Sequence, residues 1–153
     1  MAANRIKIAK DKVELVKALV ESNEKTAPFQ TYVEVMMFAA ALGAKHKKRV
    51  PLKDVAKDLS PLRQDYFSSN FTVVINLLAF TETKALNIFD EHEIADEQRI
   101  HIFEEYANGG LEVVQHELRG AVDYSERILL LLSSERFQLV KEVEEFDLGK
   151  FLS

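Results

Sequence analysis

Cysteine is absent from this chain of 153 residues, which excludes disulfides, cysteine nucleophiles and thiolate metal sites. Long apolar runs are absent as well, because no stretch approaches the ~18 residues that a membrane-spanning helix needs. The first residues, MAANRIKIAKDKVELVK, lack the continuous apolar run of a signal peptide. We therefore expect a cytoplasmic protein, most simply a bacterial one, that does not enter a membrane.

The familiar catalytic motifs are also missing. No Gly-x-x-x-x-Gly-Lys, Gly-x-Gly-x-x-Gly, His-Glu-x-x-His or Gly-x-Ser-x-Gly pattern occurs, so nucleotide hydrolysis, dinucleotide redox chemistry, zinc proteolysis and α/β-hydrolase chemistry lose their usual sequence support. Glu97 with His101 and Glu112 with His116 are spaced four residues apart, whereas di-metal bundles use Glu-x-x-His spacing. We interpret both as surface pairs and expect no metal, no cofactor and no enzymatic activity.

Composition and charge indicate an ordinary globular chain with an uneven charge distribution. The sequence is 47% hydrophobic and 29% charged, with a net charge of −5, and its length suits a single domain, 1–153, with its own core. Residues 1–54 carry 11 Lys/Arg and 6 Asp/Glu, whereas the rest of the chain carries 9 and 19. We therefore distinguish a basic N-terminal third, an acidic helical remainder (55–134) and a C-terminal tail (135–153). The basic third is compatible with a local DNA or RNA contact and equally with a solvated charged surface.

The longest helical pattern runs from Arg99 to Leu132. Its apolar residues recur at spacings of three and four, which places them on one helix face. Residues 128–132 are apolar all round, which predicts the centre of the core or a subunit contact. Gly109 and Gly110 would each cost about 1 kcal/mol in a helix interior, so we expect a kink, a short turn or a close helix crossing there. The predicted fold is a mostly α-helical, single-domain bundle with a long interrupted helix near the C-terminus and a short N-terminal strand.

That N-terminal strand is predicted by the segment Arg5 to Ile8, in which polar and β-branched apolar residues alternate. Ile6 and Ile8 would face inward, and Arg5 and Lys7 outward. A strand followed by two helices also matches the ribbon-helix-helix arrangement, in which two chains pair their strands in the DNA major groove. Arg5 and Lys7 would then reach bases or phosphates. Alternatively, the strand pairs within its own fold or with nothing.

Three further helices follow from local signals. Asp11 is expected to cap the first of them. Thr31 and Glu34 have the spacing of a capping box and begin a second helix, short and largely buried, that should end at Gly43. A third helix, starting near Asn70, is expected to be mostly buried because it carries Phe71, Val74, Ile75, Leu77 and Leu78.

The densest positive cluster is Lys45-His46-Lys47-Lys48-Arg49. Such a cluster attracts phosphate, although lysines at a helix end also favour the negative end of the helix dipole and stay solvated. The candidate nucleic-acid-binding residues are therefore Arg5, Lys7, Lys45, Lys47, Lys48 and Arg49. In the tail, we expect the large apolar residues Phe146, Phe151 and Leu152 to dock on the protein's own surface.

Several blocks of the sequence carry a family resemblance. They are RIKIAKDK (5–12), FQTY (29–32), FAAALG (38–43) and, above all, RIHIFEEYANGGLE (99–112) with LRGAVDY (118–124). With these blocks the chain resembles the small Dnd-system-associated proteins, group four, which accompany bacterial DNA phosphorothioation genes. The resemblance covers most of residues 4–134 and does not reach the tail. It implies a role in, or beside, DNA sulfur modification or its linked restriction defence against viruses, and it brings no catalytic residues. The segment from Arg5 to Leu42 is also similar to the small DNA-binding component of the Dnd modification complex.

Together these features lead to one hypothesis with two alternatives. The chain would be a non-catalytic accessory protein that contacts double-stranded DNA through its basic third. Its acidic helices would bind a protein component of the modification or restriction system, or a second copy of the chain as a homo-oligomer. The alternatives are a protein-interaction adaptor without DNA binding and a ribbon-helix-helix-like transcriptional regulator.

Overall fold

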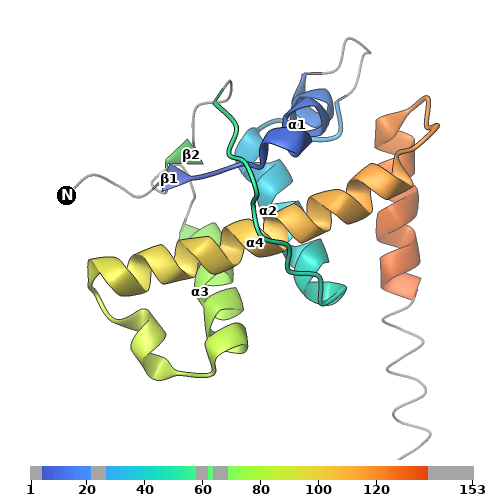
Figure 1. The fold of residues 1–153 in the computed structure, drawn as a ribbon. Coiled ribbons are helices and arrows are strands. Elements are labelled where there is room, and N and C mark those ends of the chain that lie inside the picture. The colour runs from blue at the N-terminus through green and yellow to red at the C-terminus, as the bar shows by residue number, and fades with distance from the viewer. Residues whose placement is uncertain (1–4, 22–26, 58–61, 64–68, 138–153) are drawn as a thin grey trace, which may run out of the picture.

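The fold is built around one long helix, α4 (Glu93–Glu117), which crosses the whole molecule (Figure 1). The computed structural model describes residues 5–21, 27–57, 62–63 and 69–137. The other helices in chain order are η1 (Lys10–Lys12), α1 (Val13–Val20), α2 (Tyr32–Lys45), α3 (Ser69–Thr83), η3 (Leu86–Phe89) and a helix over residues 124–137. Helix α2 crosses α4 near its middle, α3 and η3 pack along its first half, and the 124–137 helix lies across its far end. The fold is thus mostly α-helical, as predicted.

The predicted N-terminal strand is present and pairs within the chain. Strand β1 (Arg5–Ile6) runs antiparallel to β2 (Leu62–Arg63), with Ile6 opposite Leu62. Ile6 and Ile8 are buried and Lys7 is exposed, which confirms the predicted alternation. The strand therefore pairs within its own fold, which was one of the predicted alternatives. In a ribbon-helix-helix protein it would instead pair with the same strand of a second chain.

Helix α2 begins as the sequence predicts and ends later. The Thr31 hydroxyl accepts a hydrogen bond from the backbone N–H of Glu34 at 3.2 Å, and the Glu34 carboxylate accepts one from the backbone N–H of Thr31 at 3.4 Å, which completes a capping box. The predicted end at Gly43 is wrong, because the helix continues to Lys45. Gly43 instead lies in the crossing with α4, where a Cβ atom would be 2.0 Å from the carbonyl oxygen of Tyr106.

The prediction that Asp11 caps the first helix is also wrong. Ala9 precedes η1 and Lys12 precedes α1, and neither supplies a side-chain cap. The Asp11 carboxylate instead accepts a hydrogen bond at 2.9 Å from the ammonium of Lys12, whose side chain is fully buried. A buried ammonium is costly without an anionic partner, and Asp11 supplies that partner for Lys12.

Gly109 and Gly110 lie inside α4, which runs through both without a break. A Cβ atom on Gly110 would be 1.7 Å from the carbonyl oxygen of Ala39 in α2, and one on Gly109 would be 1.9 Å from the carbonyl oxygen of Lys48. Of the three predicted explanations, the close crossing is therefore confirmed. The interruption in the long helical pattern comes later, at 118–123, where Gly120 adopts a φ of +73°.

The core lies where α2 meets α4 and not at residues 128–132. Residues from both helices are fully buried there, among them Val35, Met36, Ala39, Phe103, Ala107, Leu111 and Val114. In the 124–137 helix Ile128 and Leu131 are buried in this core and Tyr124 packs against it, whereas Leu129, Leu130 and Leu132 are exposed. The prediction that 128–132 forms the centre of the core is therefore wrong, and the alternative of a subunit contact remains a prediction. Phe146, Phe151 and Leu152 lie outside the described residues.

Candidate interaction surfaces

The basic cluster begins a segment, residues 46–57, that we call the strap because it crosses α4 (Figure 1). The backbone N–H of Val50 donates to the carbonyl oxygen of Glu105 at 3.1 Å, and the side-chain amide of Asn108 donates to the carbonyl oxygen of Val50 at 3.2 Å. At the far end of the strap, the N–H of Ala56 donates to the carbonyl oxygen of Ile8 at 2.8 Å. The strap is thus fixed both to α4 and to the segment after β1.

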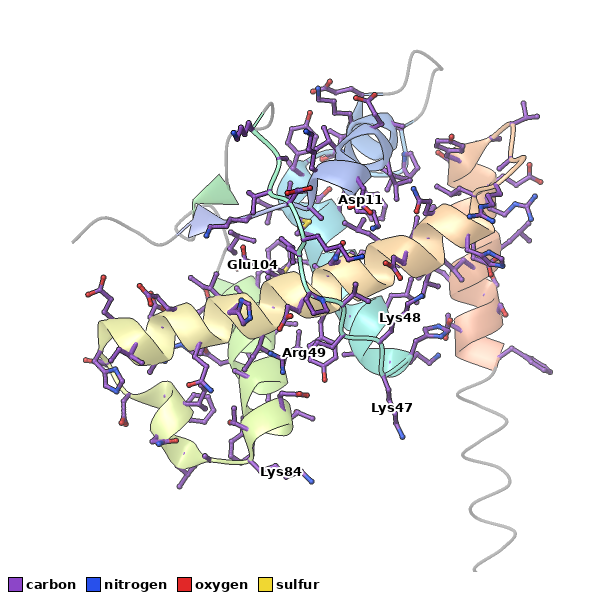
Figure 2. The ribbon with its side chains drawn as sticks, in the orientation of Figure 1. Asp11, Lys47, Lys48, Arg49, Lys84 and Glu104 are labelled. Atoms are coloured by element: carbon purple, nitrogen blue, oxygen red, sulfur yellow. The ribbon has the colours of Figure 1, made fainter. Side chains whose placement is uncertain are left out.

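Arg49 joins the strap to two helices (Figure 2). Its guanidinium approaches Oε1 of Glu105 in α4 at 2.7 Å and Oε1 of Glu82 in α3 at 2.7 Å. The Glu105 side chain is only 7% exposed and also lies 3.2 Å from Nε2 of His101. The Tyr106 hydroxyl donates to Glu82 at 2.5 Å, and this bond together with that from Arg49 lowers the pKa of Glu82. Arg49 therefore neutralises a buried carboxylate and holds α3 against α4.

Other cations of the basic third also pair with carboxylates of the acidic remainder. The ammonium of Lys48 lies 3.1 Å from Glu112, and that of Lys45 lies 2.6 Å from Glu135. His46 approaches the same Glu135 carboxylate at 2.5 Å. Burial alone would raise the pKa of Glu135, but the bonds from Lys45 and His46 outweigh it and lower that pKa. Part of the charge asymmetry seen along the sequence is thus complementarity within the fold.

The predicted nucleic-acid-binding residues do not form one surface. Lys7 follows β1 on one side of α4 in Figure 1, whereas Lys47 follows the C-terminal end of α2, which emerges on the other side of α4. Lys47 has a φ of +52° and points away from the protein (Figure 2); within the described residues its side chain forms no ion pair. Lys45, Lys48 and Arg49 are paired as described above, and the Arg5 side chain lies outside what the structure describes.

Glu104 is a buried carboxylate beside the N-terminal strand. Its Oε2 atom accepts a hydrogen bond from the backbone N–H of Lys7 at 2.6 Å. Burial raises the pKa of Glu104 to about 7, although the Lys7 hydrogen bond and charge oppose the shift. Together with Glu97 and His101, these residues line an open depression of about 540 Å³. Glu104 therefore changes charge near neutral pH while it holds the strand to α4.

A surface that the sequence did not predict lies on α3 and η3. Val73, Leu77 and Phe80 are spaced as i, i+4 and i+7 on the outer face of α3, and Leu77 is 57% exposed. Leu86 and Phe89 of η3 continue this surface, since the ring of Phe89 stacks on that of Phe80 with centroids 5.7 Å apart. We call these five residues the apolar stripe.

Helix α3 was predicted to be mostly buried, and this prediction is wrong for its outer face. The inner face, with Ile75 and Ala79, does pack against the protein. The outer face is apolar too, because Glu82 is the one charged residue in the whole helix. The sequence signal that could have revealed the stripe is this combination of apolar residues on both faces with a nearly complete lack of charge.

In the two predicted Glu–His surface pairs, Glu97 with His101 and Glu112 with His116, at least one residue of each pair has a different ionic partner. His101 lies beside Glu105, and Glu112 pairs with Lys48. Across the ranges that the structure covers, no three His, Cys, Asp or Glu side chains are grouped so as to hold a metal ion. Over the same ranges, no helix is both long and apolar enough to cross a membrane. The expected lack of a cofactor and of catalysis stays a prediction.

Comparison with protein families decides what the chain is related to. The sequence model of the family described as DNA sulphur modification system-associated protein 4 matches residues 5–151. The chain belongs to this family. The match confirms the resemblance carried by the sequence blocks and extends it into the tail, and membership associates the chain with a DNA sulfur modification system and so with protein partners. No curated protein and no solved structure is significantly similar to it.

Proposed function

We propose that this family member is a non-catalytic accessory protein of a bacterial DNA sulfur modification or linked restriction system, and that it acts by binding a protein component of that system through the apolar stripe. The observation that carries the proposal is the exposure of Val73, Leu77 and Phe80 on one face of α3. Contiguous exposed apolar surface is uncommon on soluble monomers and marks interaction sites. Both faces of α3 are apolar, and a helix that is apolar on both faces is normally covered on both. We therefore expect a binding partner to cover the outer face.

The surroundings of the stripe indicate the chemistry of the partner. Residues 90–97, which follow directly after η3, contain five Asp/Glu and no Lys/Arg. A partner that covers the stripe would therefore present an apolar helix face bordered by lysine or arginine, because like charges across an interface are repelled. The same acidic border disfavours DNA on this face.

Direct DNA contact is the second candidate function. Lys47 supports it, because its side chain points into solvent without an ion pair among the described residues. Lys45, Lys48 and Arg49 support it less, since each would have to exchange a carboxylate for a phosphate. A ribbon-helix-helix regulator is disfavoured because β1 already pairs with β2.

Co-purification with each protein encoded beside this gene, expressed one at a time, tests the proposal. We expect one component to bind the wild-type chain and to lose binding when Leu77→Ser interrupts the stripe. Leu129→Ser, a similarly exposed leucine on the 124–137 helix, is the matched control and should retain binding. If no component binds, or if both variants bind as the wild type does, the proposal is wrong.

A further inference from the structure

The 124–137 helix has two faces of different character. Ile128 and Leu131 face the core, and Glu135 attaches the helix to Lys45 and His46 at the end of α2. On the opposite face, Leu129, Leu130 and Phe137 are 65%, 57% and 71% exposed. The helix is therefore docked firmly on one side and apolar on the other.

The outer face follows a regular helical pattern. Glu126, Leu129, Leu130, Ser133 and Phe137 are all exposed and are spaced as i, i+3, i+4, i+7 and i+11. This spacing places them on a single stripe, as in a helix that packs against another helix. Ser133 at the middle of the stripe is small enough to let a second helix approach closely.

The charges at the two ends of this stripe indicate what covers it. Glu126 lies near the start and Arg136 near the end, and both are exposed. In an antiparallel pair of two such helices centred on Leu131, Glu126 of one copy lies opposite Arg136 of the second copy, and the same pair occurs again at the other end. Leu129 of one copy then lies opposite Ser133 of the other. A parallel pair would instead place Glu126 against Glu126.

We propose that the outer face of the 124–137 helix is a self-association surface, and that two copies of the chain form a two-fold dimer through antiparallel pairing of these helices. A two-fold interface uses the same patch on both copies and must therefore be self-complementary. This face meets that requirement, since Glu126 at the start of the stripe and Arg136, next to its last residue Phe137, match a reversed copy of the same helix. The apolar stripe on α3 has no such pair of end charges and is left free for the partner in the proposed function.

Sedimentation velocity of the full chain across a concentration series tests this inference. We expect the wild type to be a dimer at micromolar concentrations and Leu130→Glu to be a monomer, because each dimer would bury two added carboxylates. Leu77→Glu, which adds the same charge on α3, is the matched control and should remain a dimer. A wild type that stays monomeric throughout would overturn the inference.

A charge swap tests the antiparallel register without changing any apolar residue. Glu126→Arg alone and Arg136→Glu alone should each weaken the dimer about tenfold, because two ion pairs become two repulsions. The double variant Glu126→Arg/Arg136→Glu should restore wild-type affinity. If the single variants have no effect, or if the double variant does not recover, the antiparallel register is wrong. Because partner binding is measured separately, either result leaves the proposed function standing.

Discussion

The carbonyl oxygen of Ala39 lies only 1.7 Å from the position that a Cβ atom on Gly110 would occupy. The crossing of α2 and α4 is therefore possible only with glycine at this position. Gly43 of α2 has the same role on the other side of the crossing, because a Cβ atom on it would clash with the carbonyl oxygen of Tyr106 in α4. Because the core is built at this crossing, the two glycines determine how closely its apolar residues pack.

Gly110→Ala should destabilise the protein by about 3 kcal/mol or more, since the clash is with backbone and only a shift of a whole helix relieves it. Urea unfolding followed by circular dichroism measures the effect. Gly120→Ala is the control: a Cβ atom there would meet nothing within 4 Å, so it should cost only about 1 kcal/mol for the left-handed conformation. Wild-type stability for Gly110→Ala would contradict the close crossing.

Arg49→Ala should lower the free energy of unfolding by about 2–4 kcal/mol. The substitution leaves the buried Glu105 carboxylate without its guanidinium partner, and its cost lies between that of an exposed ion pair and that of a fully buried one. Lys47→Ala, two residues earlier in the chain, should change stability by less than about 0.5 kcal/mol because its side chain points into solvent. Equal effects of the two substitutions in urea unfolding would show that Arg49 does not hold the strap to α3 and α4.

Glu104→Gln should stabilise the protein at high pH and not at low pH. Because the pKa of Glu104 is raised to about 7 in the folded state, the folded chain holds this proton more tightly than the unfolded chain does. Stability should therefore fall as pH rises from about 4.5 to 7 and then level off. Glutamine stays neutral and still accepts the hydrogen bond from Lys7, so we expect a gain of about 2–3 kcal/mol at pH 8 and little gain near pH 4.5.

Thermal unfolding of the Glu104→Gln variant at a series of pH values measures this difference. Glu97→Gln, an exposed carboxylate on the same helix, is the control and should keep the pH profile of the wild type. A Glu104→Gln variant with an unchanged pH profile would show that the buried carboxylate does not titrate in this range.

Duplex DNA binding across a salt series separates the two candidate functions. If the basic residues contact phosphates, Lys47→Ala should reduce the slope of log affinity against log salt by about 1. Lys17→Ala, a lysine of α1 outside the candidate site, should leave the slope unchanged. A complete lack of binding at low salt would remove the DNA candidate and leave the protein partner as the proposed role.

The features that could be predicted from the sequence are local ones. The capping box of Thr31 and Glu34 depends on residues three apart, and the alternation of Ile6 and Ile8 depends on a short strand. In each case the residues that interact are only a few positions apart in the sequence. These elements were therefore predicted correctly, apart from their exact ends.

The features that could not be predicted depend on residues far apart in the chain. Gly43 resembles a helix stop because glycine favours that position, and only its contact with Tyr106 shows why it is there. The basic cluster likewise resembles a phosphate site until its carboxylate partners, such as Glu105 and Glu135, are brought to it by the fold. The outer face of α3 was missed because apolar residues alone do not distinguish core from docking surface.

The most direct test of the central claim is the affinity of the purified chain for the neighbouring gene product that co-purifies with it, measured by isothermal titration calorimetry for the wild type and for Leu77→Ser. We predict at least a tenfold weaker affinity for Leu77→Ser, because the substitution removes a leucine from the middle of the apolar stripe, and an unchanged affinity for Leu129→Ser. Equal affinities for the wild type and Leu77→Ser would contradict the claim that α3 is the partner-binding surface.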